Sequence, residues 1–392
     1  MDDPVTGFIS GSLPVSLSRR LWRACVRFLW MSKWLFLLIA LGVVGSCQSQ
    51  SQSFLWVAGS IPSGSQPTSV SCPGPSTCFV VGQNGLILLT QNGGLTYQPL
   101  DFVNGGFALA NFNLTSISCP STLICYIVGN QGLIAQTLDG GATFQVTNET
   151  VNGNLTLNSV SCQTVTTPAC VAVGSNNSMY ILPILSGAWT AVLNSSSSGV
   201  GPANYGQVAI SGSTILISAQ TTSGQGIPGL VVSSDSGVTF QFSPISQADA
   251  PQGISGVACQ LSGTCIAVGP GAVLQSQLST LSWYPVAIPQ SFSQQAGFLQ
   301  EVSPDPSGSF WLTGSSGTLI YLSNGVSQTS TGNGLWIFEL QTLPGSGISE
   351  TVGQVGCSGS YSCIAAVYSL SVNGSVYETG AQISGQSSLQ TP

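Results

Sequence analysis

The 392-residue chain has very little charge and almost no positive charge. Charged residues make up 4% of it, with five Lys and Arg, twelve Asp and Glu and no His, whereas soluble domains average about 25%. All five cations lie at or before Lys33. The rest of the chain therefore lacks the residues for P-loop phosphate binding, Ser-His-Asp catalysis, His-ligated metals and electrostatic nucleic-acid binding. We expect no metal, no cofactor and no nucleic-acid partner.

Residues 34–45 form an uninterrupted apolar run behind the basic flank. Twelve residues are too few to span a bilayer comfortably but suit the hydrophobic region of a secretory signal. The run ends in VGSC, and this resembles a bacterial lipobox in which Cys47 is lipidated. An uncleaved signal-anchor is the alternative, and both predict a body outside the cytoplasm. Translation could start at Met1 or at Met31, because the signal is complete from Met31 onward.

Seven copies of one pattern follow. The stretch SVSCPGPSTCFVVGQNGLILLTQNGGLTYQ at 69–98 returns as SISCPSTLICYIVGNQGLIAQTLDGGATFQ at 116–145. Weaker copies begin at 159, 207, 256, 301 and 354. Each copy has short alternating, β-branched segments between Gly-rich turns, which predicts four strands rather than helices. Repeats of this size and content are typical of propellers. We predict an all-β fold, a β-propeller of seven blades with four antiparallel strands each.

A shared motif occupies the third turn of three units. It reads TQNGGLTY at 90–97, TLDGGATF at 137–144 and SSDSGVTF at 233–240, which match S/T-x-D/N-x-G-x-T-aromatic. With this Asp-box motif, the chain resembles the photosystem II stability/assembly-factor-like propellers and other Asp-box (BNR-like) propellers such as sialidases. The resemblance implies a fold but no function, because the Asx side chain of such a turn bonds its own backbone. The arginines of sialidases and the basic patch of the assembly factors have no counterparts here.

These patterns divide the chain into four regions. We expect a leader with the signal segment over 1–47, a polar tether over 48–53, the propeller over 54–380 and a disordered tail over 381–392. Propellers usually close by pairing strands from their two ends. The aromatic segment 53–57 is therefore expected to complete the last blade beside residues 372–379.

Ten of the twelve Cys form pairs at one place in five units. Each pair lies in a different unit, which disfavours a four-ligand metal site, and none has the CxxC spacing of redox motifs. In an exported chain this pattern favours disulfides. The predicted bridges are Cys72–Cys78, Cys119–Cys125, Cys162–Cys170, Cys259–Cys265 and Cys357–Cys363.

Amide side chains recur in the turns between the second and third strands. Such groups donate and accept hydrogen bonds without charge and so suit neutral polyols, although turn chemistry alone also explains them. These candidate binding residues are Gln83, Asn84, Asn130, Gln131, Asn176 and Asn177. Two further candidates, Trp336 and Glu339, lie in the longest connection between units. An aromatic there could stack on a sugar or a partner protein, with core packing as the alternative.

The absence of cations also determines how the net charge of the protein changes with pH. Ten acids follow Lys33, so the net charge of this body falls from about −10 to near zero as its carboxylates protonate, without the self-repulsion that expands proteins in acid. We interpret the chain as an exported, acid-adapted propeller, anchored at the cell surface by a lipid or signal anchor, or secreted. It would bind or scaffold a neutral polysaccharide or an envelope protein without catalysis. The alternatives are compositional bias at neutral pH and an acid-active glycoside hydrolase with a carboxylate pair on its top face.

Overall fold

A computed structural model describes residues 54–380 with several gaps. The gaps are 101–102, 105–106, 147–154, 164–169, 184–187, 193–202, 223–225, 329–333, 342, 344–349, 360–361 and 370–374. The predicted leader, Cys47, the tether and the tail lie outside the described residues. No helix in the described part has the length and hydrophobicity needed to cross a bilayer.

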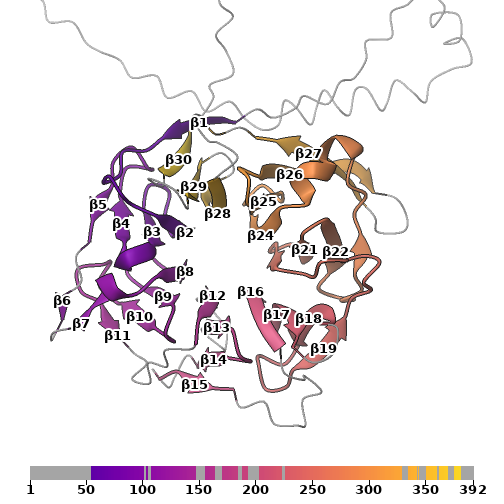
Figure 1. Cartoon of the computed structure of the whole chain (residues 1–392), viewed down its shortest axis with the longest axis horizontal. Coiled ribbons are helices and arrows are strands. Elements are labelled where there is room, and N and C mark those ends of the chain that lie inside the picture. The colour runs from indigo at the N-terminus through magenta and orange to yellow at the C-terminus, as the bar shows by residue number, and fades with distance from the viewer. Residues whose placement is uncertain are drawn as a thin grey trace, which may run out of the picture. The chain divides into compact units, whose positions relative to one another are not determined.

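Four-stranded antiparallel sheets dominate the described residues, and we call each one a blade (Figure 1). Blade 1 contains β2 (Pro67–Ser71), β3 (Cys78–Gly82), β4 (Ile87–Thr90) and β5 (Gln98–Pro99). Blade 2 contains β8 (Leu114–Ser118), β9 (Cys125–Gly129), β10 (Ile134–Thr137) and β11 (Gln145–Val146). Blade 3 contains β12 (Leu157–Cys162), β13 (Cys170–Gly174), β14 (Met179–Leu182) and β15 (Thr190–Ala191). Blade 4 contains β16 (Ala203–Ser211), β17 (Thr214–Thr221), β18 (Pro228–Ser233) and β19 (Gln241–Pro244). Blade 5 contains β20 (Gly256–Cys259), β21 (Thr264–Gly269), β22 (Ala272–Gln277) and β23 (Tyr284–Pro285). Blade 6 contains β24 (Leu299–Pro304), β25 (Phe310–Gly314), β26 (Leu319–Gln328) and β27 (Gly334–Leu340). Blade 7 combines β28 (Glu350–Gly359), β29 (Ser362–Ser369) and β30 (Ser375–Gly380) with β1 (Leu55–Ala58) from the other end of the propeller.

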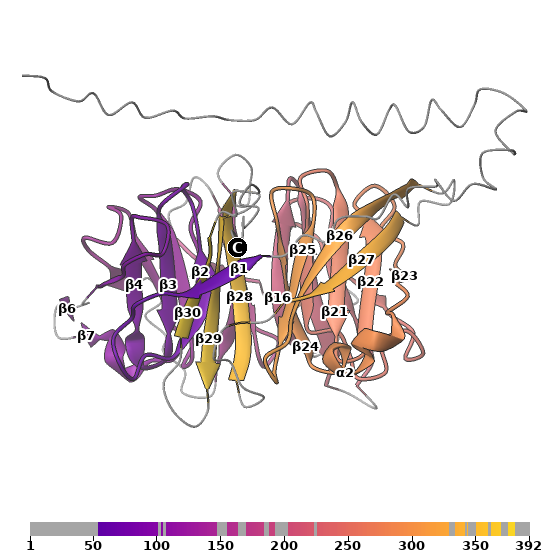
Figure 2. The ribbon, with the colours of Figure 1, turned by 90° about the horizontal axis from the view of Figure 1, so that it is seen from above.

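The first strand of every blade lies at the centre of a ring. Strands β2, β8, β12, β16, β20, β24 and β28 each contact the next one, and β28 contacts β2. Figure 1 shows the blades arranged radially about this axis, and Figure 2 shows the same ring edge-on. The buried apolar residues form clusters that mostly join the facing sides of neighbouring blades, as in the cluster that contains Phe79 and Ile127. The described part is therefore an all-β propeller, as predicted.

The predicted count of seven blades needs correction, because continuous segments of the chain form six four-stranded blades and the remaining sheet is shared between the two ends of the propeller. A separate two-stranded sheet joins β6 (Val103–Asn104) to β7 (Phe107–Ala108). Short helical turns occupy some connections. They are η3 (Gln83–Gly85), η4 (Leu109–Asn111), η5 (Gln290–Phe292) and α2 (Ser293–Ala296). The predicted anchor segment lies outside the described residues.

Closure of the ring by the N-terminal strand is confirmed. Strand β1 pairs antiparallel with β30, with Leu55 opposite Gly380 and Ala58 opposite Tyr377. Trp56 is buried, and its ring lies 5.3 Å from that of Trp311 in blade 6. The closing strand is therefore held by backbone pairing on one side and by aromatic packing on the other.

The five predicted disulfides are also present, with Cα–Cα distances of 4.0 to 4.1 Å. Each joins the end of a first strand to the start of the second strand of the same blade. At the opposite end of blades 1, 2, 3 and 6, the second strand finishes on a Gly that touches the residue preceding the first strand. A Cβ on Gly82 would lie 2.1 Å from the carbonyl oxygen of Gln66, and one on Gly314 would lie 1.8 Å from that of Phe298. The repeated Gly is thus needed for close backbone approach.

The three repeated turn motifs form self-contained hydrogen-bonded loops. In blade 2, Asp139 accepts hydrogen bonds from the Thr143 N–H at 2.8 Å and the Thr143 hydroxyl at 2.6 Å. Asp235 bonds Thr239 in the same way, and Asn92 accepts from the Thr96 N–H at 3.0 Å. The hydrogen bonds from Thr143 hold the pKa of Asp139 below its usual range, because they favour the charged form. These side chains hold the turns rather than facing a ligand.

Candidate functional site

One position of each central strand faces the axis of the ring. It lies three residues before the first Cys of a bridge, or at the matching place where the bridge is missing. The seven residues, which we call the axial ring, are Ser69, Ser116, Ser159, Gln207, Gly256, Glu301 and Gln354. Six of them are uncharged, and Glu301 is the exception.

The serines of the axial ring connect adjacent blades. A central strand has no sheet partner on its axial side, so its N–H groups need other acceptors. The Ser69 hydroxyl accepts the Ile117 N–H at 3.1 Å, and the Ser116 hydroxyl accepts the Val160 N–H at 3.2 Å. Ser159 receives the Val208 N–H at 3.2 Å in the same manner. The repeated SVSC and SISC sequences are therefore explained by contacts between blades.

Gln207 extends this pattern across two blades. Its Oε1 accepts the Val257 N–H at 3.1 Å and the Val302 N–H at 3.3 Å, and its Nε2 donates to the Val302 carbonyl at 2.9 Å. Gly256 leaves the space for this side chain, because a Cβ there would lie 3.0 Å from Gln207 Oε1. The Gln207 amide thus bonds the central strands of blades 5 and 6, just as the serine hydroxyls bond the central strands of the blades that follow them.

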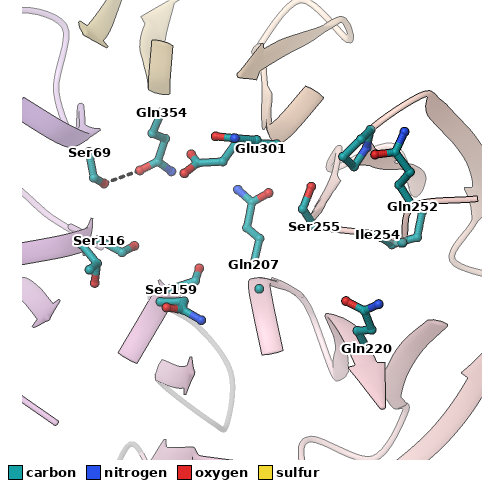
Figure 3. Close-up of a pocket in the computed structure, with 16 residues that line it drawn as sticks. Ser69, Ser116, Ser159, Gln207, Gln220, Gln252, Ile254, Ser255, Glu301 and Gln354 are labelled. Carbon is teal, nitrogen blue, oxygen red and sulfur yellow. Dashed lines mark hydrogen bonds between the residues drawn. The ribbon is translucent and has the colours of Figure 1, made fainter. Parts of the chain in front are cut away.

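An axial cavity of about 430 Å³ opens at the end of the ring where the central strands begin (Figure 3). Its wall is made of hydroxyl groups, amides and backbone, and its lining includes Ser69, Thr115, Ser116, Asn158, Ser159, Gln207, Gln220, Gln252, Ser255, Gln300, Glu301 and Gln354. A smaller cavity of about 160 Å³ lies further along the axis and shares Ser159, Gln207 and Gln354 with the first. Volumes of a few hundred Å³ suit small ligands or a short segment of a polymer.

Glu301 is the one ionisable side chain among the described residues that line the larger cavity. Figure 3 shows its carboxyl group between the amides of Gln354 and Gln207, with Ser69 bonded to the far side of Gln354. Surrounding protein removes water from this carboxyl group, and the resulting desolvation raises its pKa to about 7. Tyr368 lies close enough for the Glu301 charge to add to the effect of burial, and both raise the pKa of the tyrosine.

The raised pKa of Glu301 predicts that the protein is more stable in mild acid. The unfolded chain releases this proton near pH 4.5 and the folded chain near pH 7. The folded state therefore binds more protons between these values, and stability falls as the pH rises through this window. Burial also raises the pKa of Asp305, which acts in the same direction. The exposed Asp139 and Asp235 have lowered pKa values. They make the folded state less stable as the pH falls, but only below the range in which Glu301 titrates.

We expect a higher melting temperature at pH 4.5 than at pH 8, measured by calorimetry. Glu301→Gln should stabilise the protein at pH 8 by about 1–3 kcal/mol and flatten the profile. Asp249→Asn removes an exposed charge outside the cavity and serves as the control. A wild-type protein that melts at a higher temperature at pH 8, or a Glu301→Gln variant with the wild-type profile, would contradict this assignment.

The predicted amide residues lie in turns at the same end of the ring, but they do not line the cavity. Asn84, Gln131, Asn176 and Asn177 have positive φ values of 54° to 63°, as turn residues. Two of the side chains are engaged between elements. Asn130 Oδ1 accepts the Asn113 N–H at 2.9 Å, and Asn177 Oδ1 accepts the Tyr205 hydroxyl at 2.7 Å. The backbone N–H of Gln83 donates to Gln66 at 2.9 Å.

Trp336 and Glu339 lie on β27 at the outside of blade 6, away from the axial cavity. Trp336 is only 9% exposed, packs edge-on against Phe310 and donates its indole N–H to Gln275. This is the core packing of the alternative interpretation. Glu339 is half-buried and pairs in register with Tyr321. The structure does not bring these two residues together with the turn amides.

The carboxylates of the described residues do not form a pair at the cavity. A glycoside hydrolase of the usual type needs two carboxyl groups about 5–9.5 Å apart, and only Glu301 lines this wall. Asp305 and Cys363 are buried and Cys357 is half-buried, and the ligand atoms of the three lie within 4.8 Å of one another. These two sulfur atoms form a disulfide, so the group does not offer thiolate ligands to a metal.

Sequence reasoning did not find the axial ring. The signal was present in the repeats, because aligning their first strands puts one Glu in a column of Ser, Gln and Gly. That these seven residues face one another follows only from closure of the ring.

Comparison with known proteins supports the fold. No protein-family model matches the sequence, and no curated protein matches it. The solved structure of YCF48 bound to D1 peptide is similar, with a TM-score of 0.58 and 16% identity over 85% of this chain and 100% of that one. YCF48 from Cyanidioschyzon merolae gives 0.57 and 16% over 83% and 98%. An ancestral GH74 enzyme gives 0.56 and 13% over 81% of this chain and 46% of that one. At these identities the likeness shows the propeller fold alone.

Proposed function

We propose that the chain is an exported, surface-anchored propeller of the Asp-box type that binds or scaffolds without catalysis, and that its ligand site is the axial cavity. The observation that carries this proposal is a cavity of about 430 Å³ walled by hydroxyl and amide groups. Such groups match the hydroxyls of a neutral polysaccharide, since each can donate and accept without charge. The absence of a second carboxylate from the described wall favours binding over hydrolysis.

An envelope protein is the second candidate partner. It is supported by one fold neighbour, whose structure holds a D1 peptide. A peptide backbone also offers donors and acceptors to amide side chains. We place the polysaccharide first because most lining side chains carry hydroxyl or amide groups, and only Ile254 and Pro270 among the described lining residues are apolar side chains that could receive those of a peptide.

Export and acid adaptation are part of the same proposal. Support comes from the apolar run before Cys47, the five disulfides and the absence of cations after Lys33. No Asp or Glu of the body loses a salt bridge on acidification, because the body holds no partner for one. The buried carboxyl groups of Glu301 and Asp305 favour the folded state in acid through their raised pKa values.

Binding to a glycan array at pH 4 tests the ligand, together with an assay for new reducing ends. We expect retention of neutral glycans without cleavage. Gln220 and Gln252 are exposed at the cavity and hold none of the bonds of the axial ring. The double variant Gln220→Ala/Gln252→Ala should weaken binding by about tenfold, the equivalent of one to two hydrogen bonds.

Gln241→Ala, on the outer strand β19, is the matched control and should bind as the wild type does. Absence of binding to every glycan on the array would refute the proposal of a polysaccharide ligand. Release of reducing ends that depends on Glu301 would favour the hydrolase instead.

A further inference from the structure

Glu301 is the one charged member of the axial ring, and neither folding nor the binding of a neutral ligand requires a carboxyl group at this position. Gln354 and Gln207 occupy equivalent positions, which shows that a neutral amide of the same length fits this wall. A carboxylate in the same place is costly to ionise because protein surrounds it. The described residues contain no cation to balance its charge, since no Lys, Arg or His follows Lys33.

The other ionisable groups near Glu301 do not compensate it either. Strands β20, β21, β25 and β28 pack against β24, and their Cys residues are in disulfides. The remaining ionisable residues on this side are Glu350 on β28 and Tyr368 on β29. One is an acid and the other is neutral when protonated. The described residues therefore supply no countercharge for Glu301 when it is ionised.

We propose that the axial cavity takes an amino-sugar chain, with the ammonium group of one sugar paired to Glu301 and the hydroxyl groups of the chain bonded to the surrounding wall. The inference rests on the proposed function and names the ligand class of the same cavity. An ammonium group supplies three donors and a positive charge. The hydroxyl and amide groups of Thr115, Ser159 and Gln252 supply the neutral remainder of the site.

A lysine side chain offers the same ammonium group but fits the wall less well. Its four-carbon stem needs apolar surface, whereas most of the side chains that line the cavity carry a hydroxyl or amide group that a sugar can bond. An amino sugar instead carries hydroxyl groups next to its ammonium group. The composition of the wall therefore decides between these two sources of the charge.

The paired charge makes ligand selection depend on pH. Near pH 4 Glu301 is neutral, because its pKa is raised to about 7, and the site does not favour an ammonium group. Nearer neutrality, a bound ammonium group favours the ionised carboxylate and lowers its pKa again. The preference for the amino sugar should therefore appear as the pH rises and should be accompanied by proton release on binding.

Titration calorimetry on the full chain in detergent micelles tests this, with a β-1,4-linked glucosamine tetramer and its fully N-acetylated counterpart as probes. At pH 6.5 we expect the amine form to bind about tenfold more tightly, the equivalent of one charge-assisted hydrogen bond. At pH 4 the two should bind alike. Glu301→Gln should remove the preference at pH 6.5 and retain the acetylated tetramer, whereas Asp249→Asn should behave as the wild type.

Each other outcome counts against the inference. Equal affinities at pH 6.5 would overturn it and leave the neutral-glycan proposal standing. A preference that survives in Glu301→Gln would place the ammonium group elsewhere. Absence of binding to both tetramers, together with an empty array, would refute both proposals. A short Lys-containing peptide that competes better than the amine tetramer would assign the charge to a protein partner and overturn the amino-sugar choice.

Discussion

Removal of residues 54–58 should abolish the cooperative unfolding transition of the propeller. Without β1, the backbone groups of β30 that pair with it lose their partners, and blade 7 keeps three strands. The deletion also removes Phe54 and Trp56 from an aromatic cluster with Trp311 and Tyr321. Calorimetry on the deletion variant should show a broad transition, or none, in place of the sharp wild-type one.

Single substitutions separate packing from backbone pairing in this strand. Trp56→Ala should lower the free energy of unfolding by about 3–5 kcal/mol, because a buried Trp loses its contacts and leaves a void. Val57, its neighbour on β1, is 44% exposed. Val57→Ala is the matched control and should cost below about 1 kcal/mol. Equal denaturation midpoints for the two variants would disprove a closing role for the aromatic cluster.

Reduction of the five disulfides should have an effect of similar size on stability. The chain-entropy relation gives about 2.4 kcal/mol for a seven-residue loop, and so on the order of 10 kcal/mol for five bridges if they are additive. This equals the whole net stability of many domains. We expect denaturant titration with a phosphine reductant to show an unfolded chain where the oxidised protein is folded.

The blades provide an internal control for this measurement. Blades 4 and 6 contain no bridge. Hydrogen exchange in the oxidised protein should therefore be fastest in β16–β19 and β24–β27, and the paired variant Cys259→Ala/Cys265→Ala should bring blade 5 to their level. Unchanged midpoints after complete reduction would show that the bridges contribute nothing to stability.

Features encoded within one repeat were predictable from the sequence. Strand alternation, the Gly at the end of second strands and the spacing of Cys72 and Cys78 all act within one blade, so the propeller and its bridges could be predicted. The closing strand was predictable because its aromatic residues resemble those of other units. The two-stranded sheet at 103–108 was missed, because strands of two residues leave no periodic signal.

The candidate site was predicted less well than the fold. Its residues come from different blades and meet only through closure, as Ser69 and Gln354 do across 285 positions of sequence. The amides chosen instead, such as Asn130 and Asn177, have the right chemistry but are engaged in contacts between elements. Trp336 was ambiguous from the sequence, because hydrophobicity alone does not separate a stacking aromatic from a buried one.

The shared blade also sets an order of events during synthesis. A ribosome releases β1 near the beginning of translation, yet its pairing partner β30 ends at Gly380, more than 300 residues later. The early blades can form their own sheets and bridges as they are synthesised. Trp56, in contrast, finds its packing partner only after blade 6 is made, and β1 finds its strand partner only after β30 is made. Any truncated product that stops before β30 therefore carries an unpaired, aromatic first strand, which marks it for aggregation or quality control.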